Sequence, residues 1–119
     1  VPLHCTASGK LYLSSLPAAR RRNLIAAMTL DRQTANTIVD PEALNAELDK
    51  TRRAKVGSDN EEFIDGMVAA AVPITDQRGR LAAILAFHAP VIRMDMEKAL
   101  VHVPALQCAA AALSADINE

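Results

Sequence analysis

The residues best suited to chemistry begin with a histidine and a cysteine side by side. Cys5 follows His4, and a cysteine with a nearby histidine can act as a thiol nucleophile and its base. Neighbouring residues of an extended segment point to opposite sides, however, and a catalytic pair need not be adjacent in sequence. Cysteine is also among the residue types most often buried. We therefore predict that Cys5 is a buried structural residue, and that the chain has no catalytic residues and is not an enzyme.

Histidines and acids are the other candidates, here as metal ligands. The histidines are too scattered for metal-ligand spacing: His4, His88 and His102. Asp59, Glu61, Glu62 and His88 could still converge in the folded chain and bind a metal. Glu61 and Glu62 could also form an acid/base pair, but adjacent acids more often mark a solvated turn. We predict no metal and no cofactor.

The turn Ser8-Gly9-Lys10 is a candidate anion site. A turn of small residues that enters a helix exposes backbone N–H groups at the positive end of the helix dipole, which suits a carboxylate or a phosphate. The signal is weak by itself, because the tripeptide is common and the full phosphate-loop pattern is absent.

Composition excludes several classes of protein. The 119 residues suffice for one domain, half of them are hydrophobic, and only 3% are aromatic, which argues against binding by base stacking. The net charge of −1 gives no general attraction for phosphate backbones, and the arginine run at 20–22 is expected on the wet face of a helix. Two cysteines without a framework pattern indicate reduced thiols. With no apolar run of about 20 residues, we expect a soluble cytoplasmic domain without a membrane partner.

The first half of the chain predicts helices. Thr6 or Ser8 can cap a short helix, and Pro17 opens a second one with apolar residues on one side and the arginines on the other. A short β-favouring segment is expected at 34–39. Asp40 and Pro41 then form the clearest helix start in the sequence.

The helix that begins there buries one face. Leu44 and Leu48 lie on the same side, and basic residues suit its C-terminal end. The polar stretch at 57–60 is expected to end this element.

The pattern changes to two apolar strands between residues 67 and 89. The turn at 76–79, which ends in Gly79, separates them and predicts a hairpin at the centre of the sheet. A buried helix is the competing interpretation, because both runs are rich in alanine. Pro73 cannot donate to a strand ladder, so we expect it at a bulge or on an unpaired edge.

A long helix ends the chain. Its apolar stripe has spacings of three and four: Met96, Leu100, Val103, Leu106, Ala110, Leu113 and Ile117. Pro104 predicts a kink or a break. Helices on a central antiparallel sheet make an α+β domain.

The order of several motifs resembles IclR-type bacterial transcription regulators. Residues 3–10 resemble their Leu-His-x-Thr-Ala-x-Gly-Lys segment, and residues 37–44 resemble Thr-Ile-x-Asp-Pro-Glu-x-Leu. Residues 59–66 resemble Asp-Asp-Glu-Glu-Phe-x-x-Gly, and residues 71–79 with Pro90 complete the set. The resemblance spans nearly the whole chain in the right order.

This resemblance implies a GAF-like fold that binds a small effector, often one with a carboxylate. It implies that residues 1–119 are part of the effector-binding domain, without the first strands and the N-terminal winged helix-turn-helix that would bind DNA. A homodimer or homotetramer is expected. Carried over position by position, the ligand-binding residues would be Ala7, Ser8, Gly9, Leu11, Asp59, Ala69, Ala86 and His88.

The sequence departs from the family where specificity should be determined. Ala86 and His88 replace two serines that are common in the family, and Leu11 stands where alanine is usual. Three functions stay open: effector recognition, which we favour, an interaction module with a vestigial pocket, and a metal-binding or enzymatic domain.

Overall fold

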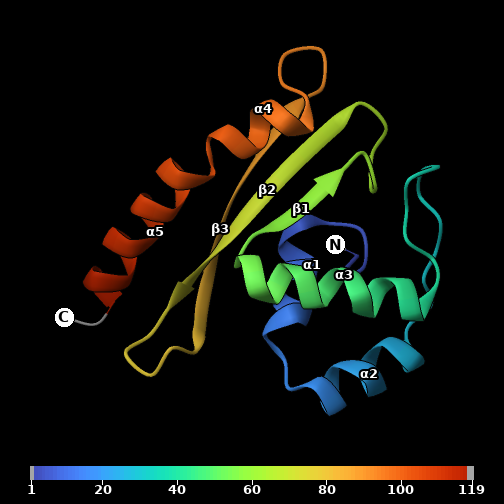
Figure 1. Ribbon diagram of the computed structural model, residues 1–119, viewed down its shortest axis with the longest axis horizontal. Helices are drawn as coiled ribbons and strands as arrows, with labels where there is room; N and C mark the ends of the chain where they lie inside the picture. Colours follow the sequence, from blue (N-terminus) through green and yellow to red (C-terminus); the bar gives the residue numbers. More distant parts are fainter. Residues whose placement is uncertain (1, 118–119) are drawn as a thin grey trace.

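The computed structural model describes residues 2–117, and it contains five helices and three strands within that range. The three strands form one sheet and the helices pack against it, as predicted for an α+β domain (Figure 1). In chain order they are α1 (Ala7–Ser15), α2 (Ala18–Ala27), α3 (Pro41–Ala54), β1 (Gly57–Asn60), β2 (Met67–Thr75), β3 (Leu81–Pro90), α4 (Met96–Val101) and α5 (Val103–Ile117).

The sheet is antiparallel, with strand order β1-β2-β3, and the predicted hairpin is its larger part. Gly79 takes the left-handed conformation (φ +74°) that the turn requires, and the Asp76 carboxylate accepts hydrogen bonds from the N–H groups of Arg78 and Arg80. Strand β1 begins at Gly57, opposite Ala71, so Pro73 has no neighbour from β1, and a register irregularity follows at residues 74–75. Both features agree with the position predicted for Pro73.

Helices cover both faces of the sheet. Helix α1 contacts all three strands on one face, and α3 packs on α1, whereas α5 packs on β2 from the other face (Figure 1). Alternation along β2 explains the alanine-rich sequence: Ala69 and Ala71 face α1, while Ala70 and Val72 face α5. Small side chains on the first face allow the helix to approach closely.

The first helices begin where the sequence predicts, but the environment of one arginine differs from the prediction. The Thr6 hydroxyl accepts a hydrogen bond from Gly9 N–H, and the Asp40 carboxylate accepts one from Ala43 N–H. Arg21 of α2 is buried, and its guanidinium binds Asp49 at 2.7 Å. The prediction that all three arginines lie on the wet face was therefore wrong for Arg21, since it lies one turn before buried Ile25.

Two segments between helix and sheet differ from the prediction. Residues 34–39 form no strand: a turn occupies 34–36, where the Thr37 hydroxyl accepts hydrogen bonds from the N–H groups of Gln33 and Thr34. Residues 57–60 do not simply end the preceding helix: they form strand β1, paired with β2. Lys55 ends α3 in the left-handed conformation.

The C-terminal helix is broken, as Pro104 predicts. His102 separates α4 from α5, and Pro104 occupies the second position of α5, where its missing N–H has no acceptor within the helix. The predicted stripe is only partly buried, because the change of direction exposes Leu100 and Leu113. The side chain of Ile117 lies outside the described part of the structure.

Candidate functional site

Three predicted site residues lie in one row across the sheet. Asp59 of β1 is paired with Ala69 of β2, and Ala69 is paired with His88 of β3. Ala71 and Ala86 form a second pair on the same face, two residues further along. Because residues two apart on a strand share a face, all five lie on the face that α1 covers.

The first turn of α1 lies close above this face. Ala7 and Leu11 pack against Ala69 and Ala71, with Ala86 at the edge of the cluster. A Cβ atom on Gly57 would lie 2.2 Å from the carbonyl oxygen of Ala7, so only glycine allows this approach.

The N–H groups of that turn differ in availability. Gly9 N–H already donates to Thr6 Oγ1 at 3.0 Å, and Leu3 fills the space where a side chain of Gly9 would lie. The N–H groups of Ala7 and Ser8 lie in the first turn of α1, where the helix itself has no carbonyl oxygen to accept their hydrogen bonds. Ser8 is half-buried, so its N–H and hydroxyl are the polar groups of this turn nearest to solvent.

Asp59 is the buried acid of the row, with 5% of its surface exposed. Its Oδ1 accepts a hydrogen bond from Glu62 N–H at 2.8 Å. Burial raises the pKa of Asp59, while hydrogen bonds from the Glu62 and Phe63 backbones and the charges of Lys10 and His88 lower it. His88 is exposed, at the open end of the row.

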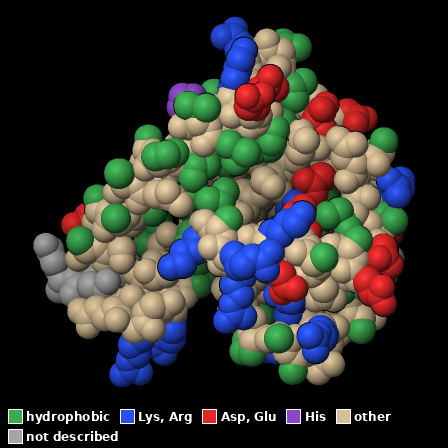
Figure 2. Space-filling view, in the orientation of Figure 1, with side chains coloured by type: hydrophobic (Ala, Val, Ile, Leu, Met, Phe, Trp, Pro, Cys, Tyr) green, Lys and Arg blue, Asp and Glu red, His purple; other side chains and the backbone are tan. Residues whose placement is uncertain are grey.

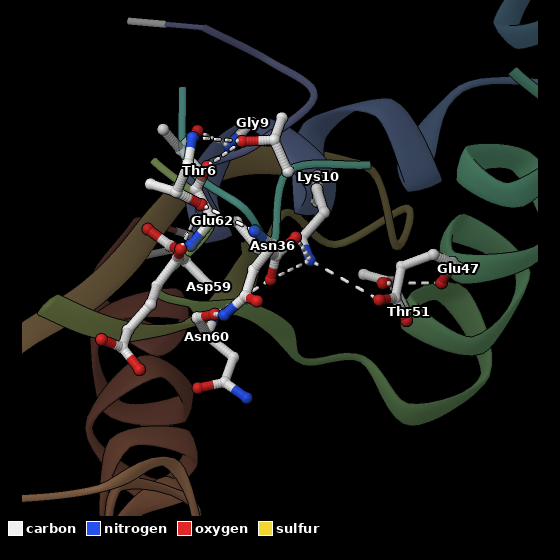
Figure 3. A network of polar contacts seen from close by, with 12 residues as sticks. Thr6, Gly9, Lys10, Asn36, Glu47, Thr51, Asp59, Asn60 and Glu62 are labelled. Atoms are coloured by element: carbon white, nitrogen blue, oxygen red, sulfur yellow. Dashed lines mark hydrogen bonds and ion pairs between the residues drawn. The ribbon is translucent and has the colours of Figure 1, made fainter. Parts of the chain in front are cut away.

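A buried ion pair, which the sequence analysis missed, supports this region. Lys10 Nζ is fully buried and donates to both carboxylate oxygens of Glu62, at 2.9 and 3.1 Å (Figure 3). Glu47 of α3 lies 3.7 Å from the same ammonium group. The expectation that Glu61 and Glu62 mark a solvated turn was wrong for Glu62, because its carboxylate pairs with a lysine distant in sequence. The sequence contains one indication of a role for these two residues: Lys10 and Glu62 each lie in a segment that resembles an IclR-type motif, 3–10 and 59–66.

Two threonine hydroxyls and a backbone N–H group hold the same loop in place. Thr34 and Thr37 donate to the carbonyl oxygens of Glu61 and Glu62, at 2.5 and 2.6 Å. The Asn60 N–H donates to Glu62 Oε2 at 2.9 Å (Figure 3). The Thr-rich turn before α3 therefore positions the loop that carries the acids.

The alternative chemistries find little support in the geometry. Cys5 is fully buried, and burial, with the nearby charges of Asp59 and Glu62, raises its pKa to about 11, which disfavours the reactive thiolate. The His4 ring is bonded to the carbonyl oxygen of Asp31 at 2.7 Å. Within residues 2–117, no group of three or more His, Cys, Asp or Glu side chains is arranged to hold a metal ion.

A separate cleft lies elsewhere on α1. Its volume is about 580 Å³, and it lies between the C-terminal half of α1, the end of α3 and the hairpin turn. Leu11 is the single predicted site residue among those that line it. Most of the predicted site, at the start of α1, is thus distinct from this cleft.

Comparison with known proteins assigns the family. Residues 1–115 match the family described as "Bacterial transcriptional regulator IclR C-terminal". The probable transcriptional regulator SauR of Cupriavidus necator is 47% identical over 110 residues, which make up 92% of this chain and 44% of that protein. The chain belongs to the IclR family of transcriptional regulators and corresponds to their C-terminal domain. These relatives are regulators and not enzymes, as the sequence predicted.

Solved structures agree with the fold. The C-terminal domain of the Escherichia coli regulator KdgR is 33% identical with a TM-score of 0.89, over 99% of this chain and 72% of that one. The inducer-binding domain of PobR from Acinetobacter, solved as a double mutant with 3-hydroxybenzoic acid, is 30% identical with a TM-score of 0.91, over 96% and 66%. The GAF-like α+β prediction is therefore confirmed. The described helices include none that is long and apolar enough to cross a membrane.

Proposed function

We propose that this chain is the effector-binding part of an IclR-type regulator, and that its effector is a small molecule with a carboxylate. The observation that carries the proposal is the row Asp59–Ala69–His88, which lies on the same sheet face as the start of α1. A buried acid, an exposed imidazole and the amino end of a helix are different polar groups around a floor of small side chains. The complex of the similar PobR domain with 3-hydroxybenzoic acid supports an effector of this class.

Each group has a role in this proposal. The effector carboxylate accepts hydrogen bonds from the N–H groups of Ala7 and Ser8, where the helix dipole favours negative charge. Asp59 accepts a hydrogen bond from a hydroxyl group elsewhere on the effector, and His88 donates or accepts according to its tautomer. Ala86, which is only partly buried at the edge of the cluster, leaves room for the body of the molecule, and Leu11 limits its size.

A series of matched ligands tests this function. Benzoate and 3-hydroxybenzoate are compared with the uncharged amides of both, and the melting temperature of the chain is measured with each. We expect a carboxylate to raise it and its amide to leave it unchanged, since a ligand that binds the folded state stabilises it. Equal effects of acid and amide would contradict the role of the α1 amino end.

His88 is the residue that should determine specificity. His88→Ala should weaken binding of a responsive carboxylate by about 0.5–1.5 kcal/mol, the net contribution of one hydrogen bond, because His88 is exposed. His88→Ser, which restores the residue common in the family, should shift preference toward smaller and more polar acids. His102→Ala is the matched control, because His102 packs edge-on against Phe87 on the opposite face of the sheet. Equal losses in the two alanine variants would refute the role of His88.

DNA binding belongs, in this proposal, to another part of a full-length regulator, since the chain spans 44% of relatives such as SauR and KdgR of E. coli. We therefore expect residues 1–119 alone to show no sequence-specific binding to duplex DNA. Sequence-specific retardation of a promoter fragment at moderate salt would contradict this.

Self-association is a second candidate function, favoured by exposed apolar side chains. Ile92 is 91% exposed and Val101 is 72% exposed, and both lie in the segment around α4. A homodimer or homotetramer that uses this surface should appear in sedimentation equilibrium as a mass that rises with concentration. Ile92→Ser together with Val101→Ser should return the chain to a monomer, whereas a wild-type chain that stays monomeric throughout would exclude this function.

A further inference from the structure

The cleft at the far end of α1 has the size of a ligand site. Its volume of about 580 Å³ falls within the range of about 300 to 1,000 Å³ that is usual for small-molecule sites. Three separate elements form its walls: α1, the end of α3, and the turn between β2 and β3. A ligand in it would therefore contact parts of the chain that are far apart in sequence.

Its charged side chains are all positive. Arg52 and Lys55 line it from α3, and Arg80 lines it from the hairpin, whereas no Asp or Glu is among the lining residues described. Figure 2 shows Lys and Arg side chains gathered beside the hollow between the two halves of the molecule. An anion in this cleft would thus meet positive charge from two opposite walls.

These cations differ in how far they are already paired. Arg80 Nε donates to Asp76 Oδ2 at 2.9 Å. Within residues 2–117, Arg52 and Lys55 have no ion pair or side-chain hydrogen bond with the rest of the chain. Two unpaired cations on the same wall are available to a ligand.

The rest of the lining combines hydroxyl groups with an apolar surface. The hydroxyls belong to Ser14, Ser15, Thr51 and Thr75. The apolar surface comes from Leu11 and Tyr12 of α1 and from Pro73 and Leu81 of the two strands. Leu11 is almost fully buried and forms part of the floor. This surface suits the hydrocarbon or aromatic body of a ligand whose charged group lies at the rim.

We propose that this cleft is a second ligand site, which binds a small anionic molecule with an apolar body, independently of the candidate effector site. The two sites lie at opposite ends of α1. Only Leu11 belongs to both, and none of the residues Asp59, Ala69 and His88 lines the cleft. One regulator domain would then respond to two small molecules through the same helix.

Titration of the ¹⁵N-labelled chain with 1-naphthyl phosphate tests the site. We expect amide shifts at Arg52, Lys55 and Gly79, with little change at Ser8 and His88. 1-Naphthol, which lacks the charge, and inorganic phosphate, which lacks the apolar body, should each bind at least about tenfold more weakly. Shifts confined to Ser8 and His88 would overturn the proposal, while leaving the proposed effector function intact.

Charge variants complete the test. Arg52→Gln with Lys55→Asn should weaken binding about tenfold, the order expected for two solvent-exposed ion pairs. Asn is chosen because Lys55 has a positive φ, which Asn tolerates. Arg80→Gln gives an independent change on the other wall and should weaken binding about threefold. The matched control, Lys50→Gln with Arg53→Gln, removes two cations from the same helix that do not line the cleft, and should change affinity less than twofold.

Two results would refute the site. Equal losses in the control and the Arg52/Lys55 variant would mean that the probe responds only to the overall charge of α3. Equal binding of 1-naphthol and 1-naphthyl phosphate would mean that the cleft has no role in recognising an anion.

Discussion

Replacement of Lys10 by methionine should be among the most damaging single changes at the start of α1. The Lys10 ammonium is fully buried and contacts both carboxylate oxygens of Glu62. The variant therefore leaves the Glu62 carboxylate buried with one hydrogen bond, from Asn60 N–H. Removing one partner of a buried ion pair costs about 3–5 kcal/mol. A whole domain is stable by only about 5–15 kcal/mol. Lys10→Met should therefore remove a large share of the total stability.

Urea unfolding followed by circular dichroism measures this loss as a lower midpoint at an unchanged slope. Glu62→Gln in the Lys10→Met background keeps an acceptor for Asn60 N–H and removes the unpaired charge, so it should recover at least about 1 kcal/mol. Arg80→Met is the matched control, because Arg80 is exposed in its pair with half-buried Asp76, and the pair should contribute less than about 1 kcal/mol.

Two results would refute this reasoning. A loss below about 1 kcal/mol in Lys10→Met would mean that water replaces the ammonium group as the partner of the Glu62 carboxylate. A double variant less stable than Lys10→Met would mean that the isolated carboxylate was not the source of the loss.

Three further predictions concern the same region. Burial raises the pKa of Asp59 in the folded chain, so the folded state holds its proton more tightly than the unfolded state does. The stability of wild type should therefore fall relative to Asp59→Asn as pH rises above about 3.9. Urea unfolding of both proteins between pH 3.5 and 6.5 would measure this. A difference in stability between them that stays constant with pH would contradict the raised pKa. With a thiol reagent at pH 8, exposed Cys108 should react at once and buried Cys5 only after unfolding, and rapid reaction of both would contradict the burial of Cys5. Gly57→Ala should cost about 1–3 kcal/mol, because its Cβ would overlap the carbonyl of Ala7, and an unchanged urea midpoint would contradict that contact.

Local signals in the sequence were sufficient for much of the fold. The cap at Asp40, the turn that ends in Gly79 and the break at Pro104 each depend on a few adjacent residues, and all three were predicted correctly. Of the two caps predicted for α1, Thr6 or Ser8, the structure has Thr6. Helix and turn boundaries are determined by backbone groups that neighbouring side chains can satisfy.

Errors occurred where a segment depends on distant partners. Residues 57–60 read as a polar end to a helix, but they pair with β2 and become a strand. Residues 34–39 have β-favouring side chains, yet the hydroxyl of Thr37 bonds nearby backbone groups and bends the segment. An edge strand or a turn this short shows no hydrophobic periodicity in the sequence from which it could be predicted.

The sequence by itself determined the family, the class of fold and the types of residue at the candidate site, because motif order and hydrophobic pattern are properties of the chain. Only the tertiary structure decided which side chains meet. It aligned Asp59, Ala69 and His88 in one row, paired Lys10 with Glu62 across 52 positions, and gathered Arg52, Lys55 and Arg80 around a cleft. The physical reason is that strand register and helix packing set distances between residues far apart in sequence, and burial then turns an ordinary charge into one that must be paired.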